Sequence, residues 1–136
     1  MSAVLVDSNV LLDVATQDPV WGDWSRTSLN RAAEHSVLAI NPVIYGEVSV
    51  GFPSIEEVDA ALPTNWLRRD AIPYEAAYLA GKVFLAYRRA GGARGSPLPD
   101  FYIGAHAAVA GYRLLTRDPF RYRTYFPKVR LRAPDS

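Results

Sequence analysis

Short apolar runs separated by longer, partly apolar segments form the main pattern of the chain. Residues 4–6, 37–40 and 113–116 have the length and composition of core strands. Two further three-residue runs, at 66–68 and 129–131, predict two more strands. Each interval between these runs, except the last, contains at least one segment with the signals of a helix.

The helix signals are specific at several positions. Asn41 followed by a proline is typical of a helix start, and Ser54 with Glu57 matches a capping box. Ser8 or Asn9 is expected to cap the first helix. The predicted helices cover residues 9–15, 20–34, 42–50, 54–63, 73–90 and 100–112. Helices that alternate with short apolar strands indicate an α/β fold whose central parallel sheet has helices on both faces.

The composition is that of a folded protein. Of the 136 residues, 49% are apolar and 21% are charged, and we expect one domain over residues 1–136. The chain has no cysteine, which excludes disulfide bonds and thiolate metal sites and fits a reducing cytosol. The first residues lack the pattern of a signal peptide, and no apolar run is long enough to cross a bilayer. We therefore expect a cytoplasmic protein that has no membrane partner.

Basic residues are concentrated near the C-terminal end, although the net charge is only +1. Between residues 113 and 132 the only acid is Asp118, and the bases are Arg113, Arg117, Arg121, Arg123, Lys128, Arg130 and Arg132. Such a segment is able to contact an anionic polymer, but it is also typical of a solvated surface. Taken alone, the pattern favours the solvated surface.

Two acids lie where strands of the predicted sheet end. Asp7 follows the first apolar run, and Asp118 comes two residues after Thr116 at the end of another. In open α/β sheets, ligands bind beyond the carboxyl ends of the strands. Acids in such loops also have structural roles, so neither acid alone decides the function.

Two further acids lie on predicted helices. Glu47 has only apolar residues and a glycine three and four positions away, so it is expected to point inward. A carboxylate there needs a cation, a buried ion pair or a path to solvent. Asp100 follows two prolines at the start of an alanine- and glycine-rich helix, where it is either a helix cap or a functional acid at the edge of the core.

Together the four acids have the chemistry of a site for a hard cation. Carboxylate oxygens without thiolates or paired histidines suit Mg²⁺ or Mn²⁺. Carboxylates held close together repel one another, and a divalent ion relieves that repulsion. We expect the four acids to form one such site: Asp7, Glu47, Asp100 and Asp118.

Four blocks of the sequence resemble the PIN-domain family, and within it the VapC toxins of prokaryotic toxin–antitoxin pairs. The blocks are VLVDSNVLLD, NPVIYGEV, LPDFYIGAHA and LLTRDPFRYRTYFP, and they occur in the family's order. The resemblance implies a three-layer α/β/α sandwich, a homodimer, and a VapB-like antitoxin whose C-terminal segment covers the active-site groove. It also implies a metal-dependent endoribonuclease whose ligands are Asp7, Glu47, Asp100 and Asp118, supported by Ser8, Asn9 and Thr116.

The expected reaction is hydrolysis of an RNA phosphodiester by a metal-activated water, which leaves a 5′-phosphate and a 3′-hydroxyl. Asp7 and Asp118 are expected to be the most central ligands. Arg94, in the glycine-rich loop, and Arg117 are the first candidates for phosphate contacts, followed by Arg121 and Arg123.

Three other residues carry weaker hypotheses. Trp21 and Trp24 either line a groove for an antitoxin helix or belong to the core. His106 lies six residues after Asp100, so helix geometry points it away from that acid, and we expect a structural, hydrogen-bonding histidine.

Three further functions compete with a ribonuclease toxin. A phosphotransfer domain of the receiver or haloacid-dehalogenase type also places acids at strand ends, but it needs an acid two positions after the nucleophile or a later strand-end lysine. Here position 9 is asparagine, and no lysine follows a core strand before Lys128. The second is a PIN nuclease of RNA processing, and the third is a non-catalytic RNA- or partner-binding PIN module.

Overall fold

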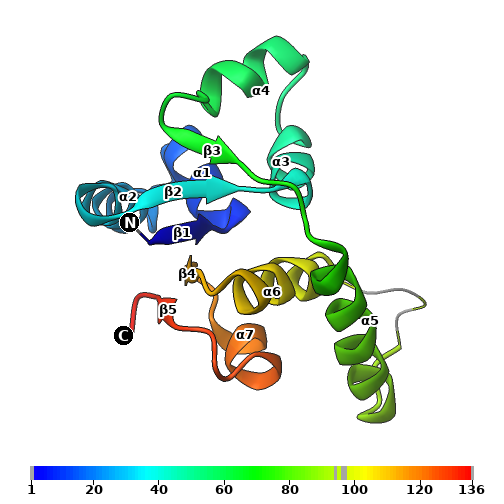
Figure 1. Ribbon diagram of the computed structural model, residues 1–136. Coiled ribbons are helices and arrows are strands. Elements are labelled where there is room, and N and C mark those ends of the chain that lie inside the picture. The colour runs from blue at the N-terminus through cyan, green and yellow to red at the C-terminus, as the bar shows by residue number, and fades with distance from the viewer. Residues whose placement is uncertain (1, 94, 96–97, 136) are drawn as a thin grey trace.

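The computed structural model describes residues 2–93, 95 and 98–135, and its course is shown in Figure 1. Within these residues, five strands form one sheet in the order β3-β2-β1-β4-β5, and every neighbouring pair is parallel. The strands are β1 (Ala3–Val6), β2 (Val37–Ile40), β3 (Leu67–Arg69), β4 (Arg113–Leu115) and β5 (Leu131–Arg132). Their parallel arrangement brings all five carboxyl ends to one edge of the sheet.

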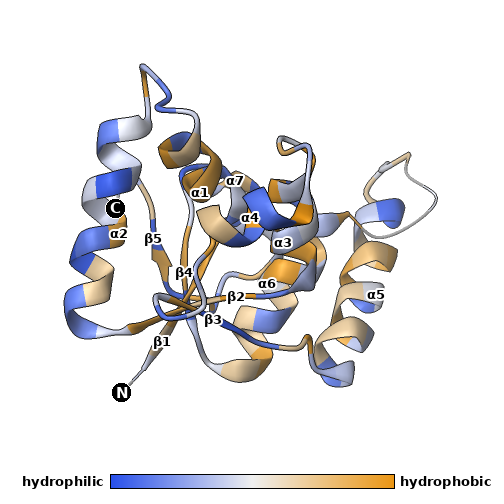
Figure 2. Ribbon diagram, turned by 90° about the horizontal axis from the view of Figure 1, so that it is seen from above, coloured by the Kyte–Doolittle hydropathy of each residue, from blue (hydrophilic) through white to orange (hydrophobic). Residues whose placement is uncertain are grey.

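Seven helices are present in the described part of the chain. They are α1 (Ser8–Ala15), α2 (Gly22–His35), α3 (Pro42–Ser49), α4 (Ile55–Ala61), α5 (Tyr74–Arg89), α6 (Pro99–Ala110) and α7 (Phe120–Tyr125). Both views place α2 and α5 on opposite sides of the molecule, with the sheet between them (Figures 1 and 2). The predicted α/β/α architecture is therefore confirmed.

The core is built around β1, which is the middle strand. All four of its residues are buried, and β1 is drawn in the hydrophobic colour in Figure 2, whereas the edge strand β3 is largely hydrophilic. Strands covered on both faces read as continuous apolar runs, which is why the sequence pattern located them. None of the helices in the described residues combines the length and apolarity needed to cross a membrane.

Helix α6 sits close to its neighbours because of one small residue. A Cβ atom added to Gly104 would lie 2.4 Å from the ring of Phe126, so only glycine fits there without movement. Helix α6 also packs extensively against α5 and contacts α7 and β4. This packing fixes the first turn of α6, which carries Asp100.

Helix α7 was not predicted. It has six residues, and its only buried one is Tyr122, so it shows no amphipathic period that a pattern search would detect. Its position matters, because Tyr122 reaches the carboxyl edge of the sheet.

Candidate functional site

Asp7 connects the first strand to the first helix. Its backbone N–H extends the sheet by donating to the carbonyl of Leu115 on β4 (2.9 Å). Its side chain then caps α1 by accepting from the backbone N–H of Ser8 (2.8 Å). The predicted cap, Ser8 or Asn9, is therefore wrong by one or two residues, because the acid itself performs that task.

The Asp7 carboxylate is buried and surrounded by hydroxyl groups. The hydroxyls of Thr116 and Tyr122 both donate to its Oδ2 atom at 2.9 Å. Within the described residues it has no ion pair. Burial is the main reason that its pKa is raised from 3.8 to about 6. The charges of Asp100 and Glu47 also raise this pKa, whereas the hydrogen bonds from Tyr122 and Thr116 lower it.

Glu47 reaches the same place from α3. The hydroxyl of Ser8 donates to its Oε1 atom at 2.9 Å and lies 3.4 Å from Oδ1 of Asp7, so one hydroxyl group connects the two acids. Burial raises the pKa of Glu47, as does the charge of Asp100, while the Ser8 hydrogen bond lowers it. The side chain is half-buried and turned toward the other acids, as its apolar neighbours on the helix predicted.

Asp100 is the second residue of α6. The helix is capped by Leu98, so Asp100 is not the cap, and that interpretation is wrong. Its Oδ1 atom lies 3.3 Å from the Tyr122 hydroxyl, and its Oδ2 atom lies 3.3 Å from Nη1 of Arg121. Burial raises the pKa of Asp100, although Arg121 and Tyr122 act in the opposite direction.

Asp118 lies at the rim of this group. Its backbone N–H donates to the Thr116 hydroxyl (3.1 Å), whereas its exposed carboxylate makes no hydrogen bond or ion pair within the described residues. Its charge nevertheless contributes to the raised pKa of Asp100. The structure thus places Asp100, rather than Asp118, beside Asp7.

Thr116 and Asn9 connect the strand ends. The buried Thr116 hydroxyl donates to Asp7 and accepts from the Asn9 side-chain amide at 3.3 Å. The Asn9 carbonyl oxygen in turn accepts from the backbone N–H of Arg117 at 3.3 Å. These hydrogen bonds hold the first turn of α1 against the residues that follow β4.

Two residues of the site escaped the sequence analysis. Tyr122 places one hydroxyl between Asp7 and Asp100, and burial raises its pKa well above 10, so it remains a donor. Asp13 is a buried acid on α1 that accepts from Ser25 and from Nε of Arg117, both at 2.8 Å. The available signals were a tyrosine within an arginine-rich stretch and an aspartate among the apolar residues of α1.

The predicted phosphate-binding arginines have different surroundings. Arg94 lies outside the described residues. Arg117 is held by Asp13 and lies over the Trp21 ring, 5.8 Å from its centroid. Arg121 is the guanidinium nearest to the acids, whereas Arg123 pairs with Asp135 at 2.9 Å.

Comparisons with known proteins show the fold. No protein-family model matches the sequence, and no curated protein sequence matches it either. The structure superposes with a TM-score of 0.74 on a chain of VapBC2 from Rickettsia felis bound to a DNA fragment from their promoter, at 17% identity over 96% of this chain and 98% of that one. DNA-bound VapBC from Salmonella typhimurium gives a TM-score of 0.70 at 20% identity, covering 98% of each chain. A toxin–antitoxin complex from Klebsiella pneumoniae gives 0.68 at 20% identity, covering 93% and 94%.

The chain has a PIN-like fold. The likeness to VapC proteins that the four sequence blocks indicated is therefore confirmed at the level of the fold. In this PIN-like sheet, Asp7 follows the middle strand and Thr116 follows its neighbour, so both lie at the carboxyl edge where ligands of such sheets bind.

The donor atoms of the cluster suit a hard cation, but they are not arranged as a finished cage. In residues 2–93, 95 and 98–135, no group of three or more acidic or histidine side chains is positioned to hold a metal ion. Hydroxyl groups of Ser8 and Tyr122 stand between the carboxylates instead. The chemistry of the carboxylate oxygens fits Mg²⁺ or Mn²⁺, and side-chain rotation would be needed to bring them onto one ion.

Helix α6 carries a structural histidine, His106. Nδ1 of His106 is 3.0 Å from the side-chain amide of Asn41, which also caps α3 by accepting from Ile44. His106 is buried, and burial lowers its pKa, so the neutral ring accepts a hydrogen bond from the Asn41 side-chain N–H. The predicted hydrogen-bonding role of His106 is confirmed.

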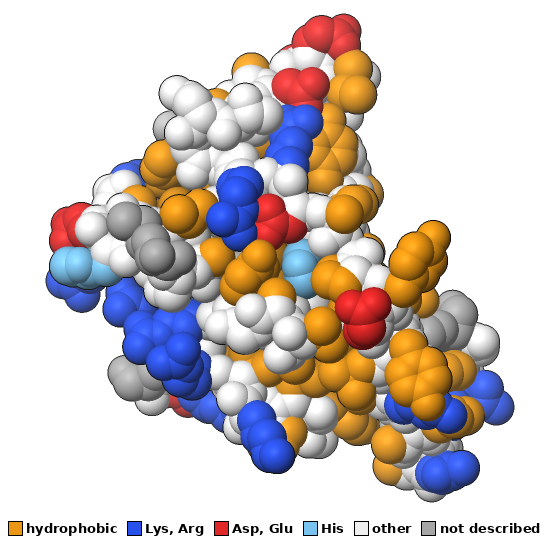
Figure 3. Space-filling model, viewed as in Figure 1, with side chains coloured by type: hydrophobic (Ala, Val, Ile, Leu, Met, Phe, Trp, Pro, Cys, Tyr) orange, Lys and Arg blue, Asp and Glu red, His pale blue; other side chains and the backbone are white. Residues whose placement is uncertain are grey.

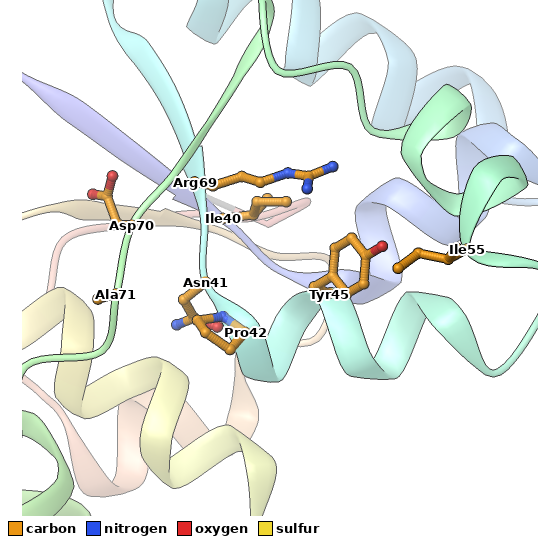
Figure 4. Close-up of a pocket in the computed structure, with 8 residues that line it drawn as sticks. All are labelled: Ile40, Asn41, Pro42, Tyr45, Ile55, Arg69, Asp70 and Ala71. Atoms are coloured by element: carbon orange, nitrogen blue, oxygen red, sulfur yellow. The ribbon is translucent and has the colours of Figure 1, made fainter.

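A separate hollow of about 420 Å³ opens at the carboxyl ends of β2 and β3 (Figure 4). It lies between the start of α3, the start of α4 and the segment after β3, and Arg69 stacks over the Tyr45 ring there at 5.0 Å. Its lining is mostly apolar and includes none of the four acids. We assign the candidate site to the acid cluster and not to this hollow.

Trp21 and Trp24 stand edge to face, with ring centroids 6.2 Å apart. Both are half-buried, and Trp24 packs against the core. Their burial fits a part-structural role, and the predicted antitoxin contact stays a prediction.

Proposed function

We propose that this chain is a Mg²⁺- or Mn²⁺-dependent endoribonuclease and the toxin of a toxin–antitoxin pair. The observation that carries the proposal is the convergence of three acids from three elements. Asp7 and Glu47 share the Ser8 hydroxyl, and Asp7 and Asp100 share the Tyr122 hydroxyl. Structural stability alone gives no reason to gather three carboxylates at the open edge of a sheet.

The electrostatics of the cluster favour a divalent cation. The pKa values of Asp7, Glu47 and Asp100 are all raised, and the neighbouring acids contribute to each shift. At neutral pH the Asp7 carboxyl is nevertheless ionised for most of the time, because its pKa is about 6. Among the described residues, Arg121 is the one cation paired with them. A doubly charged ion would therefore relieve a repulsion that one guanidinium leaves in place.

The roles of individual residues follow from their positions. Asp7, Glu47 and Asp100 would hold the ion, and Asp118 would join them from the rim. A bound ion would polarise a scissile phosphate and lower the pKa of the attacking water. Thr116, Ser8 and Asn9 orient the carboxylates through the hydrogen bonds described above. Arg121 stands where it could contact a phosphate oxygen of the RNA.

The partners we propose follow from the structural neighbours. Those neighbours are toxin–antitoxin complexes, and two of the three described above are bound to DNA. We propose a VapB-like antitoxin that covers the acid cluster, and a homodimer of this chain. Expression of the chain alone should arrest growth, and co-expression of the neighbouring open reading frame should relieve the arrest. A chain that leaves growth unaffected but cleaves RNA would instead be a nuclease of RNA processing.

The test of the chemistry compares four proteins on bulk RNA. The wild type should cleave RNA with Mn²⁺ and lose this activity in chelator, with 5′-phosphate and 3′-hydroxyl ends at the cuts. Asp7→Asn and Asp100→Ala should be inactive, whereas Glu34→Gln, which changes an exposed acid on α2, should behave as the wild type. Cleavage that persists both in chelator and in Asp7→Asn would contradict the proposal.

One observation favours a second candidate. The ion pair between Asp100 and Arg121, together with the hydroxyls between the acids, gives the carboxylates partners without any metal. These partners are compatible with a non-catalytic PIN module that binds RNA or a protein partner. Such a module would bind RNA without cutting it, and Mn²⁺ would leave its melting temperature unchanged.

A further inference from the structure

We propose that an arginine-lined groove between α2 and the edge strand β5 binds the backbone of single-stranded RNA, away from the acid cluster. This inference rests on the proposed ribonuclease function and extends it with a second substrate-binding surface. It also gives a role to the basic C-terminal segment, of whose described bases only Arg121 pairs with the acid cluster.

The groove has a volume of about 450 Å³ and a mainly polar lining that includes four arginines. Helix α2 contributes Trp24 and Arg31, β4 contributes Arg113, and the β5 segment contributes Arg130 and Arg132. Lysine and arginine side chains gather at the lower left of the molecule in Figure 3, over the region where β4 and β5 lie in Figure 1. Four guanidinium groups from three separate elements therefore face one hollow.

Six other arginines of the described residues pair with aspartates, whereas these four do not. The described ion pairs of arginine join Arg26, Arg68, Arg69, Arg117, Arg121 and Arg123 to aspartates. Within the described residues, no such pair and no side-chain hydrogen bond involves the groove arginines. Like charges gathered without counter-charges repel one another, and an anionic polymer would relieve that repulsion. Several phosphates in a row match several guanidinium groups along one groove.

Aromatic side chains connect the groove to the acid cluster. Trp24 lines the groove and contacts Trp21 edge to face, and the Arg117 guanidinium lies over the Trp21 ring. Arg117 directly follows Thr116, which donates to Asp7. Arginines interleaved with aromatic rings are typical of surfaces that bind single-stranded nucleic acid, because unpaired bases stack on rings while cations hold phosphates.

The other candidate occupant is an acidic peptide, such as part of an antitoxin. A peptide that added a strand to the sheet would gain little, because β5 has only two residues, Leu131 and Arg132. RNA uses both the charges and the exposed part of the Trp24 ring, so the observations favour RNA.

The test measures RNA binding in chelator, where no metal-dependent cleavage occurs. The variant Arg31→Gln/Arg130→Gln removes two charges from the groove, and the control Lys82→Gln/Arg89→Gln removes two from α5, on the opposite side of the molecule. The probe is a fluorescein-labelled single-stranded RNA of mixed sequence, followed by anisotropy. The variant Arg31→Lys/Arg130→Lys keeps the charge and should bind as the wild type.

Salt dependence gives the expected magnitude. If four phosphates are neutralised, affinity should fall about 50-fold between roughly 50 and 200 mM salt, since each contact with a single strand contributes a slope of about −0.7. The groove variant should fall only about 7-fold over the same range, whereas the control should keep the wild-type slope. Equal slopes for the groove variant and the control would overturn the proposal. Tighter binding of an oligo-glutamate than of the RNA at this groove would also overturn the proposal.

The outcome separates the groove from the ribonuclease function. A reduced salt slope in the groove variant, in a chain that never cleaves RNA, would support the groove and refute the ribonuclease. Cleavage of RNA with an unchanged slope would refute the groove alone. Unchanged melting temperatures of the three variants would show that each remains folded, as expected for exposed side chains.

Discussion

Replacing Asp7 by asparagine should stabilise the metal-free protein at neutral pH, although it alters a buried residue that accepts several hydrogen bonds. Burial, together with the charges of Asp100 and Glu47, raises the pKa of Asp7 from 3.8 to about 6. At about 1.36 kcal/mol for each pKa unit, ionising this carboxyl in the folded state costs about 3 kcal/mol. The amide of asparagine has one acceptor oxygen instead of two, which offsets about 1–2 kcal/mol of the gain. The net expectation at pH 7 is a variant that is more stable by about 1–2 kcal/mol.

The dependence on pH gives a sharper expectation, because the hydrogen-bond loss is nearly independent of pH. Below pH 3.8 the Asp7 carboxyl is protonated in both the folded and the unfolded chain, so its pKa shift has no effect on stability. Between 3.8 and about 6 the folded chain binds more protons, so the free energy of unfolding of the wild type falls as pH rises. Asparagine does not titrate. The stability of Asp7→Asn relative to the wild type should therefore rise by about 2 kcal/mol between roughly pH 4.5 and 7.5.

Urea unfolding in chelator, followed by tryptophan fluorescence across this pH range, measures the difference. The control Glu34→Gln should track the wild type at every pH. At pH 7, Mn²⁺ should make the wild type more stable than Asp7→Asn. An ion at 100 times its Kd stabilises the wild type by about 2.7 kcal/mol, whereas the variant lacks one of the carboxylates that would bind the ion. A difference between Asp7→Asn and the wild type that stays constant with pH would refute the reasoning about burial and charge.

Two predictions concern the frame around the acids, and both are measured by urea unfolding. Tyr122→Phe removes the hydroxyl between two carboxylates and should lower the free energy of unfolding by about 1.5–3 kcal/mol, while Tyr78→Phe, on the exposed face of α5, should have no effect. Gly104→Ala places a methyl group 2.4 Å from the Phe126 ring and should cost about 1–3 kcal/mol. Gly81→Ala meets no atom within 4 Å in the middle of α5 and should instead stabilise the protein by about 0.5–1 kcal/mol. Equal effects of the two alanines would contradict the packing argument for α6.

The order of strands and helices could be predicted from the sequence because its signals are local. Apolar runs marked the buried strands, and Asn41 and Ser54 marked helix starts that the structure confirms. The first helix cap was misplaced by one or two residues, since Asp7 is both the strand-end acid and the cap. Sequence patterns do not show that one side chain has two tasks.

The contacts within the site could not be predicted, because they depend on residues far apart in the chain. The distance between Asp7 and Tyr122 depends on how α7 packs, and α7 has no periodic pattern of its own. The same limit applies to Asp13, whose partner Arg117 comes from the other end of the sequence. The relative positions of Asp100 and Asp118 were reversed for this reason: proximity to a strand end is visible in sequence, whereas the close packing of α6 against Phe126 is not.

The middle position of β1 has a consequence for the timing of assembly during translation. Asp7 leaves the ribosome early, but the hydroxyls of Thr116 and Tyr122 that hold its carboxylate lie 109 and 115 residues later. Asp7 therefore lacks these two hydrogen-bond donors until almost all of this sequence has been synthesised. The set of hydrogen bonds around the Asp7 carboxylate is therefore completed only after the segment that completes the sheet has left the ribosome.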